Sequence, residues 1–181
     1  MAMDEKESIY RSVLILKCQM GDQHAWTELY RMFNPALGYY IRRLLGKEHL
    51  AADVQQEIWF SVVRNLPRLK NPEAFAVWIY RIAHSKVMNH LLRGNSSLPL
   101  DENDDYAADE PEDFTPADAA RIHAGLDQLS PIHREVLLLR FMEDLSYEQI
   151  AEIAGCSVGT VRSRLHNAKR DLRHILEKAY E

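Results

Sequence analysis

The stretch "SYEQIAEIAGCSVGTVRSRLHNAKRDLRHILEK", residues 146–178, predicts two helices joined by a short turn. Ser146 and Ser157 suit the N-cap positions, because a serine hydroxyl accepts a hydrogen bond from a free backbone N–H there. Gly155 suits the turn between the helices. Apolar residues of the second helix recur at spacings of four and three, so they share one face: Val161, Leu165, Ala168, Leu172 and Ile175. The pattern is typical of a helix-turn-helix.

The opposite face of the second helix is polar and basic. Five basic residues and one acid lie between Thr160 and His174. Such a helix fits the major groove, with its first residues at base edges and flanking cations at phosphates. The candidate DNA contacts are Ser157, Thr160, Arg162, Ser163, Arg164, His166, Asn167, Lys169 and Arg170. A basic face that is merely solvated is the alternative.

Composition excludes several classes of protein. No apolar run approaches the roughly 18 residues of a membrane span, and the N-terminus is charged where a signal peptide is apolar. We therefore expect a cytoplasmic protein without membrane insertion. Two distant cysteines, Cys18 and Cys156, do not form a disulfide framework. The sequence has no HExxH and no Gly-rich phosphate loop, so we expect no enzyme, no metal and no cofactor.

Charge divides the chain into three parts. The formal net charge is −5, but residues 94–117 alone carry eight acidic and no basic residues, with three prolines. This composition predicts a flexible acidic linker. The periodicity on both sides is helical, so the predicted fold is all-α, with small helical domains at residues 1–93 and 118–181.

Helix signals divide each predicted domain further. We expect a helix from about Asp22 with Ala25, Trp26, Leu29, Tyr30 and Phe33 pointing inward, and a second helix that starts after Pro35 and is ended by Gly46. A third runs from Ala51 to about Leu66 and, after a loop with two prolines, a fourth covers residues 74–93. Residues 117–129 and 130–142 form two helices ahead of the helix-turn-helix, the second capped by Ser130.

The helix from Ala51 has two different faces. Ala51, Val54, Ile58 and Val62 form one stripe, and Asp53, Gln56, Glu57 and Phe60 form another on roughly the opposite side. Acidic and amide groups around an exposed aromatic, Phe60 or Trp59, suit a basic helical partner. The alternative is that another helix of the same domain covers Phe60.

Several stretches resemble one known family. "LSYEQIAEIAG" (145–155) and "GTVRSRLH" (159–166) resemble region 4 of extracytoplasmic-function (ECF) sigma factors. "GDQHAWTELYRMF" (21–33), "ADVQQEIWFSVV" (52–63) and "FAVWIYRIAHSK" (75–86) resemble region 2, in the same order. The resemblance implies a bacterial transcription initiation factor that binds core RNA polymerase and directs it to promoters.

The resemblance also assigns roles to residues. Asp53, Gln56, Glu57 and Phe60 would contact the clamp coiled coil of the largest polymerase subunit. The loop and the fourth helix would capture the minus-ten element as a single strand, with the candidates Arg68, Lys70, Asn71, Arg81, His84, Lys86, Asn89 and Arg93. Trp78 and Ile82 are expected in the core. The helix-turn-helix would read the minus-thirty-five element, and an anti-sigma factor is an implied partner.

The chain departs from the family's usual residues at several positions. Ser85, Asn89 and Leu92 stand where Asn, Asp and Arg are common, and Ala52 replaces an acid. Asn167 stands at a DNA-contact position that Arg usually holds, and Asn pairs best with adenine where Arg pairs with guanine. A regulator that binds DNA alone, with a helical dimerisation or sensing domain, is the alternative function. Such a protein would bind duplex DNA without polymerase.

Overall fold

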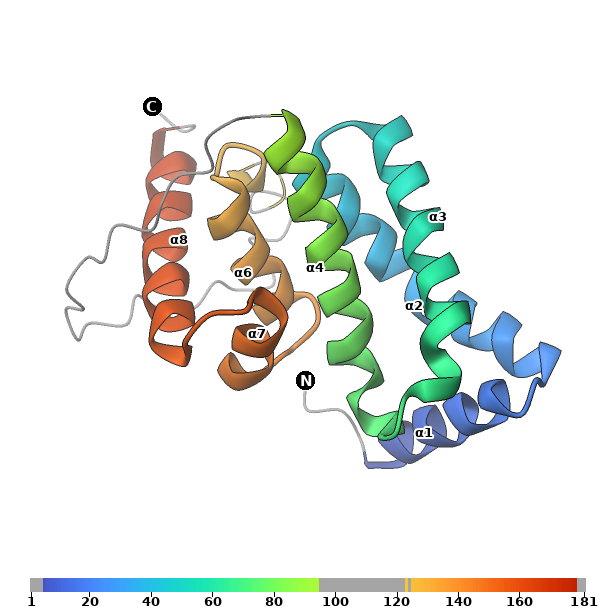
Figure 1. Ribbon diagram of the computed structural model, residues 1–181. Helices are drawn as coiled ribbons and strands as arrows, with labels where there is room; N and C mark the ends of the chain where they lie inside the picture. Colours follow the sequence, from blue (N-terminus) through green and yellow to red (C-terminus); the bar gives the residue numbers. More distant parts are fainter. Residues whose placement is uncertain (1–4, 95–122, 124, 179–181) are drawn as a thin grey trace. The chain divides into compact units, whose positions relative to one another are not determined.

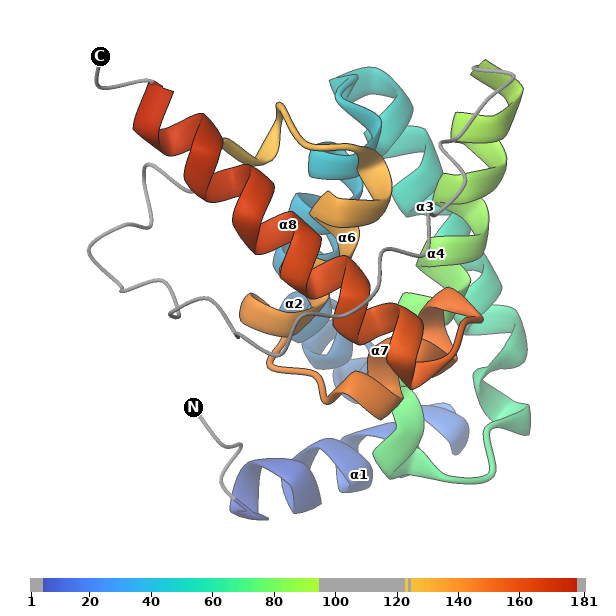
Figure 2. The same cartoon turned by 90° about the vertical axis from the view of Figure 1, so that its left-hand side faces the viewer.

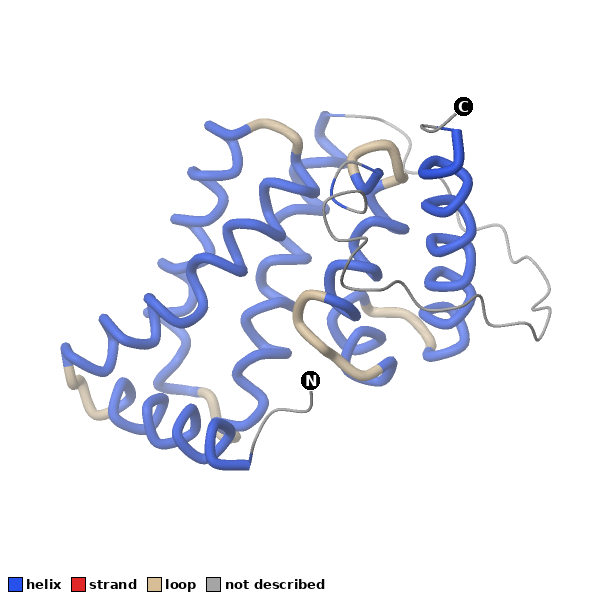
Figure 3. The backbone as a smooth tube through the Cα atoms, turned by 180° about the vertical axis from the view of Figure 1, so that it is seen from behind, coloured by secondary structure: helices blue, strands red, loops and turns tan. Residues whose placement is uncertain are grey.

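Every regular element that the computed structural model describes is helical, as predicted (Figure 1, Figure 3). The structure describes residues 5–94, 123 and 125–178. The chain divides into two units, Met1–Arg93 and Gly94–Glu181, and each is described by itself. The predicted linker lies outside the described residues except for residue 94. None of the helices in the described part of the chain is long and apolar enough to cross a membrane.

In the described residues from 5 onward, the first unit is a bundle of four α-helices and two short 3-10 turns. Its elements are α1 (Glu5–Gln19), α2 (Gln23–Leu45), α3 (Glu48–Asn65), η1 (Leu66–Arg68), η2 (Pro72–Ala74) and α4 (Phe75–Gly94). Edge-to-face aromatic pairs join α2 to α4 in the core. The ring centroids of Phe33 and Phe75 are 4.9 Å apart, and those of Tyr40 and Tyr80 are 5.2 Å apart.

Helix α2 runs without a break through Pro35, so the predicted division at that residue is wrong. A proline removes one helical hydrogen bond and crowds the preceding turn. Pro35 lies on the exposed side, however, and the buried stripe of Leu29, Phe33, Leu37 and Ile41 continues on both sides of it. Burial of one continuous face therefore outweighs the local cost.

Two signals at the ends of α2 act as predicted. The Asp22 carboxylate accepts hydrogen bonds from the backbone N–H groups of His24 and Ala25, at 2.8 and 3.1 Å. Gly46 ends the helix in the left-handed region, with φ of 66°. Tyr30, predicted to point inward, is instead 47% exposed at the edge of the buried stripe, 4.9 Å from the Trp59 ring. Its phenol can keep its hydroxyl in water there.

Helix α1 is an element that the sequence analysis did not identify. It packs against α2 and the turns η1 and η2 (Figure 1). The Gln19 side chain donates hydrogen bonds to the carbonyls of Leu66 and Leu69, at 2.9 and 2.8 Å, and so fixes the start of the α3–α4 connection. Burial raises the pKa of the Cys18 thiol on α1 to about 11, consistent with a neutral packing residue.

The second unit contains the helix-turn-helix. Its long elements are α6 (Pro131–Phe141), α7 (Tyr147–Ala154) and α8 (Val158–Lys178), and both shorter helices pack against α8 (Figure 2). Ser130 and Ser146 cap α6 and α7, and Gly155 turns the chain with φ of 63°. Most of the helix predicted at residues 117–129 lies outside the described residues. The predicted helix-turn-helix is therefore present.

Candidate polymerase and nucleic-acid interfaces

Helix α3 carries the two different faces that its sequence predicts. Ala51, Val54, Ile58 and Val62 are buried, whereas Asp53, Gln56, Glu57 and Phe60 are exposed. Phe60 is 66% exposed and Trp59 only 8%. The alternative that another helix of this unit covers Phe60 does not hold. The exposed set is hereafter called the α3 stripe.

A polar contact that sequence reasoning missed fixes the rotation of α3. The amide of Gln55 donates to the carbonyl and to Oδ1 of Asn34, at 2.9 and 2.6 Å, and Trp59 Nε1 donates to the same Oδ1 at 3.0 Å. A Cβ added at Gly38 would lie 2.8 Å from Gln55 Nε2, so glycine at this position of α2 leaves room for the Gln55 amide. With Trp59 held inward, Phe60 faces outward.

The minus-ten candidates occupy the α3–α4 connection and α4. Arg68, Lys70 and Asn71 are exposed in the connection, where Asn71 Oδ1 accepts from the backbone N–H of Glu73 at 3.1 Å. On α4, Arg81, Asn89 and Arg93 are exposed, and His84 and Lys86 are half-buried. The unusual residues Ser85 and Leu92 are exposed on α4 too. Trp78 and Ile82, expected in the core, are only half-buried.

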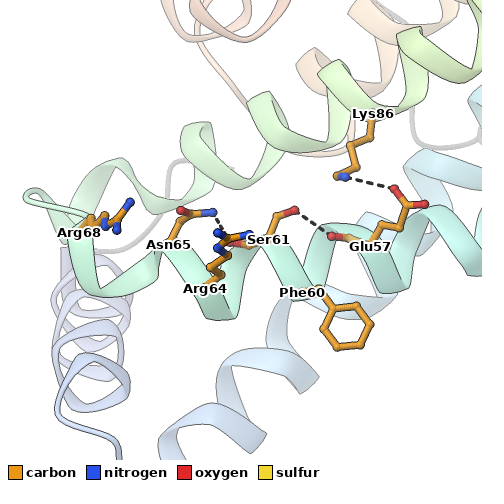
Figure 4. A pocket seen from close by; sticks show the side chains of 7 residues that line it. All are labelled: Glu57, Phe60, Ser61, Arg64, Asn65, Arg68 and Lys86. Atoms are coloured by element: carbon orange, nitrogen blue, oxygen red, sulfur yellow. Dashed lines mark hydrogen bonds and ion pairs between the residues drawn. The ribbon is translucent and has the colours of Figure 1, made fainter.

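A hollow lies between the α3 stripe and the minus-ten candidates. Its lining residues are Glu57, Phe60, Ser61, Arg64, Asn65, Arg68 and Lys86 (Figure 4). Lys86 Nζ on α4 and Glu57 Oε2 on α3 form an ion pair of 3.1 Å across it. One interaction therefore joins a predicted polymerase contact to a predicted DNA contact. Arg64 and Asn65 were not among the predicted site residues.

The outer surface of the helix-turn-helix is built on α8. Ser157 Oγ accepts from the backbone N–H of Thr160 at 3.0 Å, which confirms the predicted cap. Arg162 and Arg170 are exposed, whereas five further candidates on the helix are half-buried: Thr160, Ser163, Arg164, His166 and Asn167. Arg164 Nη1 lies 3.6 Å from Cys156 Sγ in the turn. Helix α8 thus has a buried apolar side and a polar side that carries exposed cations.

Lys169 differs from the other candidates on α8. It is only 8% exposed, and its Nζ lies 5.4 Å from the centre of the Phe141 ring on α6. This cation–π contact stabilises the α6–α8 packing. The other face of α8 is fixed to α6 by His133 Nδ1 and Asp171 Oδ2, which are 3.0 Å apart.

Comparisons with known proteins match both units. Residues 29–96 match the family described as Sigma-70 region 2, and residues 119–172 match Sigma-70, region 4. The RNA polymerase sigma-H factor of Pseudomonas aeruginosa is 32% identical, over 91% of this chain and 92% of that protein. The ECF RNA polymerase sigma-E factor of Escherichia coli K12 is 29% identical, over 90% of this chain and 92% of that protein. The chain belongs to the ECF sigma factors.

A solved structure shows the same fold. The sigma factor RpoE of Bartonella quintana, in a co-crystal structure with the anti-sigma factor NepR, is similar with a TM-score of 0.64 at 21% identity. The similarity covers 84% of this chain and 96% of that chain. The two family regions thus coincide with elements already described. In the present chain, region 2 includes α3 and α4, and region 4 includes α6, α7 and most of α8.

Proposed function

We propose that this ECF sigma factor binds core RNA polymerase through the α3 stripe and reads promoter DNA with α4 and α8. The observation that carries the proposal is the exposure of Phe60 beside Asp53, Gln56 and Glu57. An exposed aromatic ring surrounded by acidic and amide groups suits the core of an interface with a basic helical partner. The clamp coiled coil of the largest polymerase subunit is that partner.

The minus-ten element binds along the α3–α4 connection and α4. Promoter opening exposes single-stranded DNA, and proteins hold single strands in basic grooves that track the backbone. The residues assigned to this role are Arg68, Lys70, Asn71, Arg81, His84, Lys86, Asn89 and Arg93. Gln19 supports the connection by its two hydrogen bonds to the carbonyls of Leu66 and Leu69.

The minus-thirty-five element binds to α8 in the major groove. Thr160, at the start of the helix, and Ser163, His166 and Asn167 reach base edges, while Arg162, Arg164 and Arg170 meet phosphates. Ser157 supports the start of the helix as its cap. We assign Lys169 to the α6–α8 contact rather than to DNA, because its ammonium packs over Phe141.

The remaining parts of the chain serve these two contacts. Residues 1–93 and 118–181 act as the two binding domains, and the acidic residues 94–117 connect them. An anti-sigma factor is the regulatory partner. The sigma factor RpoE of Bartonella quintana, which has the same fold, was crystallised with such a partner, NepR. The protein acts in the cytoplasm with polymerase and performs no catalysis of its own.

Promoter-directed transcription tests the proposal. Purified bacterial core polymerase is supplied with a pool of promoter fragments, with and without this protein. We expect defined start sites only when the protein is added, and their upstream sequences give the promoter elements. A protein that fails to bind core polymerase, yet binds duplex DNA as a dimer, would instead be the stand-alone regulator.

A further inference from the structure

We propose that the hollow on the C-terminal half of α3 binds a phosphodiester of single-stranded promoter DNA, with Arg64 and Arg68 as its ligands. The inference rests on the proposed function and deepens it. It extends the minus-ten surface from α4 across to α3, and it gives Arg64 a role that no motif assigns.

The charge of the hollow favours an anion. Arg64, Arg68 and Lys86 line it together with one carboxylate, Glu57. The Glu57 carboxylate is already paired with Lys86 at 3.1 Å, so the two guanidinium groups remain uncompensated in a chain whose net charge is −5. Neither Arg64 nor Arg68 forms an ion pair with any residue that the structure describes. An anion in the hollow would therefore meet two cationic ligands whose charge no other described residue balances.

The position of the groups favours a phosphate at the rim rather than a deeply buried ion. Arg64 lies near the end of α3 and Arg68 lies in η1, and both line the hollow. Lys86 reaches the hollow from α4 (Figure 4). Asn65 Nδ2 and Ser61 Oγ donate to the carbonyls of Ser61 and Glu57, at 2.8 and 2.9 Å. These two donors are occupied, so the guanidinium groups are the ones available.

The chemistry and continuity of the site favour a nucleic-acid strand. A guanidinium presents paired N–H donors that match the oxygens of a phosphate. Two lining residues, Arg68 and Lys86, already belong to the minus-ten set, so one strand can meet the hollow and that set along a single path. Arg64 is not part of the α3 stripe, and Phe60 of that stripe points away from α4 although it also lines the hollow (Figure 4). A free phosphate or nucleotide offers the same group, and the experiment separates these sources.

The test uses the full chain assembled with core polymerase on a promoter fragment whose minus-ten region is already single-stranded. Affinity is measured by fluorescence anisotropy at several salt concentrations for wild type, Arg64→Ala and Arg64→Lys. Arg31→Ala is the matched control, because Arg31 is exposed on α2 and carries the same charge. Circular dichroism checks the fold, and a separate titration measures affinity for core polymerase.

We expect Arg64→Ala to weaken DNA binding roughly threefold to tenfold, equally for all sequences, because a phosphate contact carries no base information. The slope of log affinity against log salt should fall by about 0.7 for the lost contact with a single strand. Arg64→Lys should recover part of the affinity, and Arg31→Ala should match wild type. Affinity for core polymerase should not change.

Three outcomes would overturn the inference. If Arg64→Ala binds DNA with the same affinity and the same salt slope as wild type, the hollow does not touch DNA. If Arg64→Ala also loses affinity for core polymerase, the hollow belongs to the polymerase interface instead. Saturable binding of inorganic phosphate or a deoxynucleoside monophosphate to the full chain, lost in Arg64→Ala, would assign it to a free ligand. A wild-type protein that directs no transcription would contradict the proposed function itself, which the variants alone do not test.

Discussion

Trp59 and Phe60 are neighbours on α3 but have different surroundings. The indole N–H of Trp59 reaches the Asn34 side chain on α2, so that ring packs inward. Phe60 carries no polar group for such a contact and remains 66% exposed. An exposed ring of this size is costly in water unless a partner covers it. The outward position of Phe60 in the α3 stripe is therefore set by a part-buried hydrogen bond of its neighbour.

Reversing two charges in the α3 stripe tests the polymerase contact. We expect the double substitution Asp53→Lys and Glu57→Lys to abolish binding to core polymerase, because both carboxylates would become cations facing a basic partner. The measurement is co-elution or anisotropy with purified core polymerase. Glu57→Lys also replaces the ion pair with Lys86 by two neighbouring ammonium groups. The free energy of unfolding in urea is therefore measured for the double variant and for wild type.

Helix content by circular dichroism is the control for this pair of substitutions. Both side chains are exposed, so the helical signal should match wild type. A loss of folded structure would mean that the α3 stripe supports the bundle internally. Full binding to polymerase by a folded double variant would remove the stripe from the interface.

Asn167 on α8 tests how the minus-thirty-five element is read. An asparagine pairs best with adenine in the major groove, and a good bidentate contact discriminates by about 1–3 kcal/mol. Selection of promoters from a random pool by the assembled holoenzyme should return adenine at the base beneath Asn167. We expect Asn167→Ala to lose that preference and to keep the preferences at other positions. Guanine at this base, or an unchanged preference in the variant, would contradict the assignment.

The limits of sequence reasoning are clear at the residue scale. Periodicity predicted the two faces of α3, because the 3.6-residue repeat alone sets which side chains share a side. It left Phe60 and Trp59 undecided, since the acceptor Asn34 lies 25 residues away in sequence from Trp59. Arg64 was missed for the same reason: the α4 residue Lys86 lines the hollow opposite it, and no local pattern indicates that.

Among the elements, α2 and α7 depend on different forces. Helix α2 survives Pro35 because one buried stripe continues across it, which local propensity could not predict. Helix α7 has only eight residues and buries Ile150, Ala151 and Ile153. So short a helix depends on its ends. The cap at Ser146 was predicted from sequence because its hydrogen bond is local, and the structure adds the reciprocal bond to Gln149.

Removing the cap of α7 should therefore destabilise the second unit. The Ser146 hydroxyl accepts from the backbone N–H of Gln149 at 3.2 Å, and the Gln149 side chain accepts from the backbone N–H of Ser146 at 2.8 Å. We expect Ser146→Ala to lower the free energy of unfolding by about 1 kcal/mol. Urea unfolding measures the change. Since the two bonds form one motif, Ser146→Ala and Gln149→Ala together should cost less than the sum of the single changes.

The N-cap of α2 predicts a pH dependence of stability. The backbone N–H of Ala25, and then that of His24, holds the pKa of the Asp22 carboxyl below its ordinary value. A carboxyl with a lowered pKa in the folded state contributes stability above its unfolded pKa of about 4 and loses that contribution as the pH falls through the folded pKa. We expect Asp22→Asn to show a smaller fall in stability over this acidic range. Urea midpoints at successive pH values measure it, and an identical pH profile in the variant would exclude Asp22 as a contributor.

Across the whole molecule, local signals identified the two modules better than the first helix. The caps at Ser130, Ser146 and Ser157 and the turn at Gly155 predicted the starts of α6, α7 and α8 correctly, because each is decided within a few residues. Helix α1 was not predicted. Its buried residues Leu14, Ile15 and Cys18 follow a charged start, and the helix is secured by packing on α2 and on the distant turns η1 and η2.

The acidic residues 94–117 predict a role in the early steps of transcription. Eight carboxylates in 24 residues can occupy basic channels that are built for nucleic acid. A connector held in such a channel would compete with nascent RNA for the same positive charge. Replacing all eight acids by Asn and Gln keeps the length of the connector, so we expect core binding and start sites to be unchanged. The ratio of abortive to full-length transcripts should change, because the competition between connector and RNA is weakened. Quantitative transcription assays measure that ratio, and an unchanged ratio would leave the segment as a plain tether between the two DNA-binding units.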